Sequence, residues 1–120
     1  MTSMFRKNFD SPDEMRPMQG GEVAVVDLGE VKAMRLTLEP GWRWSENVKP
    51  IAGTDSCQVH HIGYQMSGSL MVRSNDGSEQ EYGPGDVYNI PPGHDAWVVG
   101  DEPVVSIDFR GAETYAKRNS

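Results

Sequence analysis

Side chains that bind metals or act as nucleophiles are few in this chain, which has one cysteine and three histidines. Cys57 and His61 lie four residues apart, and Asp55 lies two residues before Cys57. On a regular strand all three side chains would point to the same face. Imidazole and thiolate together suit zinc or another transition metal of borderline softness. The candidate metal ligands are therefore His61, His94, Cys57 and Asp55, and the alternative is a polar pocket that holds no ion.

The spacing of these residues sets a condition on any shared metal. Residues four apart on an extended strand lie about 13 Å apart. Cys57 and His61 can therefore bind one ion only if the chain turns between them. Adjacent side chains on a strand point to opposite sides, so at most one of His60 and His61 faces an interior. A one-residue slip in strand register would exchange the two.

Cys57 has a second interpretation, as a nucleophile. It would need a neighbouring base to form a thiolate, and His61 or His94 could supply one. A single cysteine is more often a small buried apolar residue, so we assign no catalytic residue from the sequence.

A pair of aromatic residues and an arginine form a second candidate group. Arg43 could hold a carboxylate through two hydrogen bonds, and tryptophans often line small-molecule pockets. The alternative is core packing for Trp42 or Trp44 and a surface ion pair for Arg43, for example with Glu46 or Asp95. The predicted pocket residues are Arg43, Trp44, His60 and Trp97.

The elements that would position these residues are short strands. Runs rich in β-branched residues, separated by glycine and proline, follow one another through most of the chain. Asn75-Asp76-Gly77 is typical of a hairpin turn. Strands are expected over residues 22–28, 31–38, 60–66, 69–73, 80–82, 86–90, 95–99 and 104–109, with a further strand beginning near Trp42. Eight or nine short strands without a long amphipathic helix predict an all-β sandwich or barrel, closed to protect its edges.

The two ends of the chain lie outside the expected barrel. Ser11 and Pro12 are typical of a helix start, and Pro17 would end that helix after one turn. We expect an N-terminal arm over residues 1–20, a barrel over 21–111 and a tail over 112–120, with a short helix from Ala112 to Arg118. Residues 46–56 are expected to be irregular.

Composition excludes several classes of function. The formal net charge of −7 disfavours nucleic acid and anionic membranes, which require a basic surface. No apolar run approaches the roughly 20 residues of a membrane span, and the N-terminus lacks the apolar core of a secretory signal. One cysteine permits no intramolecular disulfide. A cytoplasmic protein is the default expectation.

Turn residues in the second half of the chain resemble those of the cupins. The segment from Gly85 to Gly93 reads as the start of the second cupin motif, a glycine, five residues and Pro-x-Gly. Gly68 lies seven residues after His61, which is the spacing between the glutamate and the glycine of the first cupin motif. Pro40-Gly41 resembles the turn that opens that first motif. The chain thus resembles a small single-domain cupin over residues 36–109. That implies a jelly-roll β-barrel (a double-stranded β-helix), which commonly forms a homodimer.

The same resemblance implies a replaced ligand set in the first motif. His61 stands at the position of the cupin glutamate, which favours His61 over His60 as the inward residue. Asp55 and Cys57 then stand at the positions of the two cupin histidines. Counting forward from the opening turn instead would put Asn47 and Lys49 there, and both alignments remain open.

In the second motif, Ala96 stands at the position of the remaining cupin histidine, and His94 would share its face of the strand. The cupin resemblance permits isomerases, dioxygenases, decarboxylases and lyases, and a divalent metal such as Zn, Fe, Ni or Mn. The function expected is binding of a small molecule in the barrel, with a carboxylate as one candidate group. Whether the protein is a metal-dependent enzyme or a metal-free binding or sensing module stays open.

Overall fold

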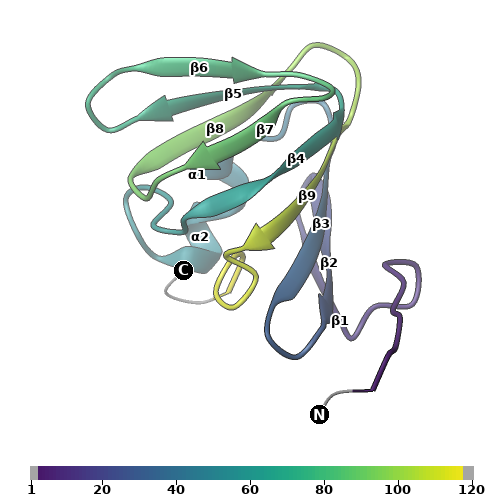
Figure 1. The fold of residues 1–120 in the computed structure, drawn as a ribbon. Coiled ribbons are helices and arrows are strands. Elements are labelled where there is room, and N and C mark those ends of the chain that lie inside the picture. The colour runs from purple at the N-terminus through teal and green to yellow at the C-terminus, as the bar shows by residue number, and fades with distance from the viewer. Residues whose placement is uncertain (1–2, 118–120) are drawn as a thin grey trace.

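Two antiparallel sheets make up the computed structural model, which describes residues 3–117 (Figure 1). The first sheet has the strand order β1-β2-β3-β9-β4-β7, and the second has the order β6-β5-β8. In chain order, the strands are β1 (Glu14–Met18), β2 (Gly21–Asp27), β3 (Lys32–Leu38), β4 (His61–Ser67), β5 (Ser69–Ser74), β6 (Glu79–Tyr82), β7 (Val87–Ile90), β8 (His94–Val99) and β9 (Val104–Arg110). The expected all-β jelly-roll barrel is confirmed.

Alternation along the strands decides which side chains enter the barrel. On β8, His94, Ala96 and Val98 are buried while the residues between them are partly exposed. On β4, the buried positions begin at His61 and recur at every second residue up to Gln65. Because side chains on a strand alternate between its faces, these residues point to the same interior.

The N-terminal arm differs from the prediction. Instead of a helical turn starting at Ser11, the arm forms β1, which pairs with β2 and places Pro17 opposite Glu22. A proline is tolerated there because β1 is an edge strand. Arg16, which is buried, donates a hydrogen bond from Nη1 to the carbonyl oxygen of Tyr115 at 2.7 Å, which ties this strand to the C-terminal segment.

The segment expected to be irregular contains two short helices, α1 (Trp44–Asn47) and α2 (Lys49–Ala52). The further strand expected near Trp42 does not form. In its place, Arg43 makes an isolated bridge with Trp97 of β8. A proline in the first turn of α2 and Gly53 after its end, with φ of 77°, favour a short helix there. Within residues 3–117, no helix is both long and apolar enough to cross a membrane.

The C-terminal segment forms turns rather than the expected helix. The Tyr115 N–H donates to the Gly111 carbonyl at 3.0 Å, and Tyr115 itself is buried. Its aromatic ring packs into the core, which holds the chain against the barrel. Arg118, the expected last residue of the helix, lies outside the described residues.

Candidate metal centre

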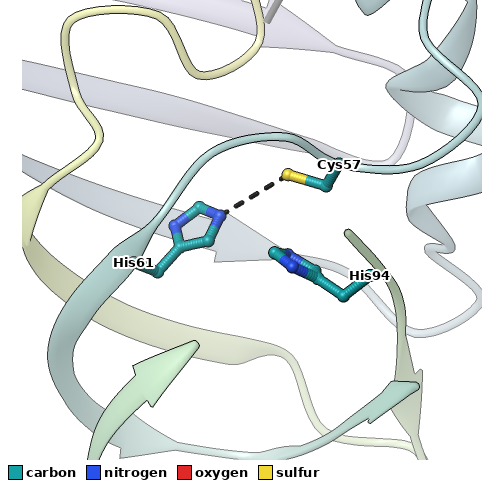
Figure 2. A group of neighbouring side chains, drawn as sticks. All are labelled: Cys57, His61 and His94. Carbon is teal, nitrogen blue, oxygen red and sulfur yellow. Dashed lines mark hydrogen bonds between the residues drawn. The ribbon is translucent and has the colours of Figure 1, made fainter. Parts of the chain in front are cut away.

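Three side chains of metal-ligating type meet inside the barrel (Figure 2). Cys57, His61 and His94 are all buried, and each offers one ligand atom within 4.8 Å of the others. The sulfur of Cys57 lies 3.7 Å from Nε2 of His61. Residues 58–60 belong to no strand, and the chain curves between Cys57 and His61, which lets the two side chains approach each other (Figure 2).

Backbone pairing fixes where two of these residues lie. Cys57 forms an isolated bridge with His94, in which the Cys57 N–H donates to the His94 carbonyl at 2.8 Å. The Gly93 N–H donates to the Cys57 carbonyl at 2.7 Å. His61 begins β4 and pairs with Ile90 of β7, so the third side chain comes from the facing sheet.

Both histidines have one ring nitrogen committed to an acceptor. Nδ1 of His61 donates to a carboxylate oxygen of Asp108 at 2.6 Å, and Nδ1 of His94 donates to the carbonyl oxygen of Pro91 at 2.7 Å. In a neutral imidazole the other nitrogen then carries a lone pair. Metal-binding histidines in proteins are commonly held by such acceptors on their second nitrogen.

Asp108 is the centre of a buried polar network. It is 1% exposed, and the Tyr88 hydroxyl donates to its second carboxylate oxygen. The Tyr115 ring lies edge-on to His61, with ring centroids 5.1 Å apart. Asp108 was not predicted from the sequence. A signal for it was present, because Ser106 and Asp108 are polar residues at the inward-facing positions of β9, where an apolar residue such as Val104 is expected.

Electrostatics couple the thiol to the imidazole. Burial raises the pKa of Cys57, but hydrogen bonds from His61 and His94 outweigh it and lower the pKa to about 6. Burial lowers the pKa of His61, but the charge and hydrogen bond of Asp108 outweigh it and raise the pKa to about 10. Without a metal, Cys57 and His61 therefore favour a thiolate and an imidazolium.

A cavity of about 40 Å³ adjoins the three ligating side chains. A buried water needs roughly 10–15 Å³ measured in this way, so the cavity has room for a few waters or one small ligand. Its walls are mostly apolar. Nε1 of Trp42 is buried without a hydrogen-bond partner among the described residues, and Trp42 is one of the lining residues.

Asp55 and His60, two residues predicted for the site, lie outside the cavity. Asp55 is exposed and pairs with Lys49 at 3.8 Å, so it is not grouped with the other three candidate ligands. It follows the last turn of α2, where the backbone is not extended and strand parity no longer applies. His60 contacts the Asn89 side chain and points away from the cavity, as strand alternation requires once His61 is inside.

Of the other three predicted pocket residues, one lines the cavity and two lie outside it. Trp44 lines the cavity, whereas Arg43 and Trp97 do not. The Arg43 guanidinium lies 4.3 Å from the Trp97 ring centroid and 3.5 Å from Asp95. This stacking and ion pair match the alternative interpretation of Arg43, and no arginine lines the cavity within residues 3–117.

Comparison with known proteins relates the chain to solved structures. No family model matches it, and no curated protein matches it significantly. Oxalate decarboxylase from Bacillus subtilis is 25% identical over 82% of this chain, with a TM-score of 0.55. The match covers 27% of the length of that enzyme, for which Mn(II) centres are described.

Two smaller proteins of unknown function have the same fold. A protein from Rhizobium leguminosarum is 18% identical over 91% of this chain and 99% of its own, with a TM-score of 0.57. A DUF1255 protein from Acinetobacter sp. ADP1 is 12% identical over 76% of this chain and 81% of its own, with a TM-score of 0.54. With its two-sheet barrel and these structural neighbours, the chain is a small cupin domain by fold.

Proposed function

We propose that the barrel binds one divalent transition metal through Cys57, His61 and His94, and a small molecule beside it. The observation that carries this proposal is the convergence of three buried ligand atoms within 4.8 Å of one another. In both histidines Nδ1 is held by an acceptor, so Nε2 is the atom that would bind the metal, and in His61 the metal would replace the contact of Nε2 with the Cys57 sulfur.

The donor set favours zinc over manganese. One thiolate and two imidazoles suit Zn(II) or Fe(II), whereas Mn(II) prefers carboxylate, carbonyl and water oxygens. Three protein ligands with one open position are typical of catalytic zinc sites. The nearest carboxylate, on Asp108, is engaged by His61 and Tyr88, which disfavours its use as a direct ligand.

A bound metal would supply a Lewis acid to a small ligand in the cavity. The protein's own contribution is to hold the ligands and to exclude bulk water. Asp108 keeps the His61 ring in one orientation. Arg43 is not proposed to bind a carboxylate group of the small molecule, because Arg43 does not line the cavity.

Metal titration of protein purified without a metal-affinity tag tests the proposal. We expect one equivalent of zinc per chain, and Co(II) should produce an intense near-ultraviolet thiolate absorption. Cys57→Ser should remove that absorption, while the exposed Asp55→Asn leaves it unchanged. A wild-type protein that takes up none of the five metals Zn, Fe, Co, Ni and Mn stoichiometrically contradicts the proposal.

One observation favours a second candidate, a thiol nucleophile. Cys57, His61 and Asp108 lie in series, with the sulfur 3.7 Å from the imidazole and the imidazole 2.6 Å from the carboxylate. This order is the arrangement that activates catalytic cysteines. Iodoacetamide would form an S–C bond with loss of iodide, and mass spectrometry would measure the rate. Fast alkylation in metal-free protein that slows in His61→Asn would support this candidate.

A further inference from the structure

A second hollow lies beside the metal centre, at the seam between the two sheets. β6 and β7 are the outer strands of their respective sheets and do not pair with each other. Between them lies a groove of about 330 Å³, lined by Val72, Ser74, Ser78, Glu79, Gln80, Tyr82, Ile90, Pro91 and His94.

The groove lies against the wall of the inner cavity. Val72, Ile90 and His94 line both hollows, and two of these have register partners that line the groove. Ser74 is the partner of His94, and Gln80 is the partner of Val72. A molecule in the groove would therefore lie next to one of the three proposed metal ligands.

Uncharged hydrogen-bond acceptors dominate the polar part of the groove. The hydroxyl group of Ser78 donates to the Asp76 carboxylate at 2.7 Å, so its proton is committed and its oxygen lone pairs remain, and the Ser74 hydroxyl oxygen is a second acceptor. Nε2 of Gln80 donates to the Glu81 carbonyl at 3.1 Å, which leaves its side-chain oxygen as an acceptor. A ligand rich in donors is complementary to these groups.

The charges around the groove disfavour an anion. Its lining holds Glu79 and, among the described residues, no lysine or arginine. Arg73, the register partner of Glu79, is not among the residues that line the groove. The Asp76 carboxylate, which accepts from the lining residue Ser78, has its pKa lowered by the Ser78 hydrogen bonds and stays ionised. A carboxylate ligand would meet the Glu79 carboxylate and find no lysine or arginine among the lining residues that the structure describes.

We propose that this groove binds an uncharged, polyhydroxylated small molecule, whose hydroxyl groups donate to Ser74, Ser78 and Gln80. The volume of the groove lies at the lower end of the range for small-molecule sites, which suits a six-carbon polyol. This site goes beyond the proposed metal function and shares only His94 with its ligands.

Two six-carbon compounds, glucitol and gluconate, test the inference. They differ at one end, where gluconate has a carboxylate in place of a hydroxymethyl group of glucitol. Backbone amide shifts of ¹⁵N-labelled protein, with and without zinc, give the site and the affinity. We expect glucitol to shift the amides of residues 74–82 saturably and gluconate to bind at least tenfold more weakly. Gln80→Met, which keeps the side-chain length and removes the amide, should weaken glucitol binding, and Gln19→Met, exposed and outside the groove, should not.

Equal or tighter binding of gluconate would overturn the inference, and so would the absence of saturable shifts at residues 74–82. The outcome is separable from that of the metal proposal. Glucitol binding to a protein that takes up no metal leaves the groove site standing and removes the metal centre. Zinc binding without glucitol shifts does the reverse.

Discussion

At the scale of single residues, Asp108 decides how the metal centre is oriented. It is the acceptor for His61 and for Tyr88, and both contacts are buried. A carboxylate on the second nitrogen of a metal-binding histidine fixes the ring and raises its basicity. If the proposed metal binds, Asp108 is a positioning residue, because it would act on the metal through His61.

Replacing Asp108 tests this role. Asp108→Asn keeps the shape of the side chain but removes its charge, and we expect zinc affinity to fall by about 10–100-fold. Competition with a chromophoric chelator measures the change. Asp101→Asn, on an exposed turn, is the matched control and should leave zinc affinity unaltered. Equal zinc affinity in wild type and Asp108→Asn would contradict the role.

The same pair predicts a pH dependence for the metal-free protein. Asp108 raises the pKa of His61 to about 10, from an ordinary value of 6.5. Because the folded pKa lies above the unfolded one, the stabilisation is fully present below pH 6.5 and is lost as the pH rises through 10. The free energy of unfolding of wild type minus that of Asp108→Asn, from urea denaturation, should therefore decrease across this range. A constant difference would rule out the charged pair.

At the scale of elements, close contact between β4 and β9 makes the site possible. Gly63 of β4 faces Asp108 of β9, and a Cβ at position 63 would overlap the Ile107 carbonyl and the Asp108 carboxylate. Only glycine permits this approach of the two strands. The absence of a side chain on β4 therefore supplies the space that Asp108 fills.

Gly63→Ala tests this contact. We expect a loss of about 3 kcal/mol in the free energy of unfolding, because the overlap involves backbone atoms that cannot move aside. Gly83→Ala is the control, since its Cβ would meet nothing closer than Asp86 at 4.0 Å, and should change stability by less than about 0.5 kcal/mol. Chemical denaturation measures both. Equal stability of the two variants would mean that the strands can separate without cost.

Arg16 connects two further elements, β1 and the C-terminal turns. Its buried guanidinium donates to the Tyr115 carbonyl and pairs with Glu14. Arg16→Met should lower the free energy of unfolding by about 1.5–3 kcal/mol, the range for a hydrogen bond to a charged group. The exposed Arg73→Met should change it by less than about 0.5 kcal/mol, as measured by thermal and urea unfolding. An equal effect of both substitutions would exclude a special role for this link.

At the scale of the whole molecule, the proposed metal binding would be linked to folding. Zinc at 100 times its dissociation constant would stabilise the folded state by about 2.7 kcal/mol. For a chain of 120 residues this raises the melting temperature by on the order of 10 °C. Calorimetry of chelator-treated and zinc-loaded protein measures the shift, and His94→Ala should abolish it. An equal shift in His94→Ala would remove His94 from the ligand set.

Much of this architecture was predictable from the amino-acid sequence. Alternating β-branched runs and glycine–proline turns predicted eight strands close to their observed bounds, and the cupin resemblance is confirmed by the fold. The sequence also singled out Cys57, His61 and His94. These predictions rest on local patterns, in which a few neighbouring residues determine strand, turn and side-chain parity.

The tertiary structure decided what local patterns could not. β1 pairs along β2 although its sequence is polar and contains Pro17, because an edge strand needs only one partner. The Trp44 segment becomes helical because its indole is buried in the core. Asp108 reaches His61 only through the pairing of strands more than 40 residues apart in the chain. The identities of the ligating residues are thus encoded locally, while their geometry depends on long-range sheet pairing.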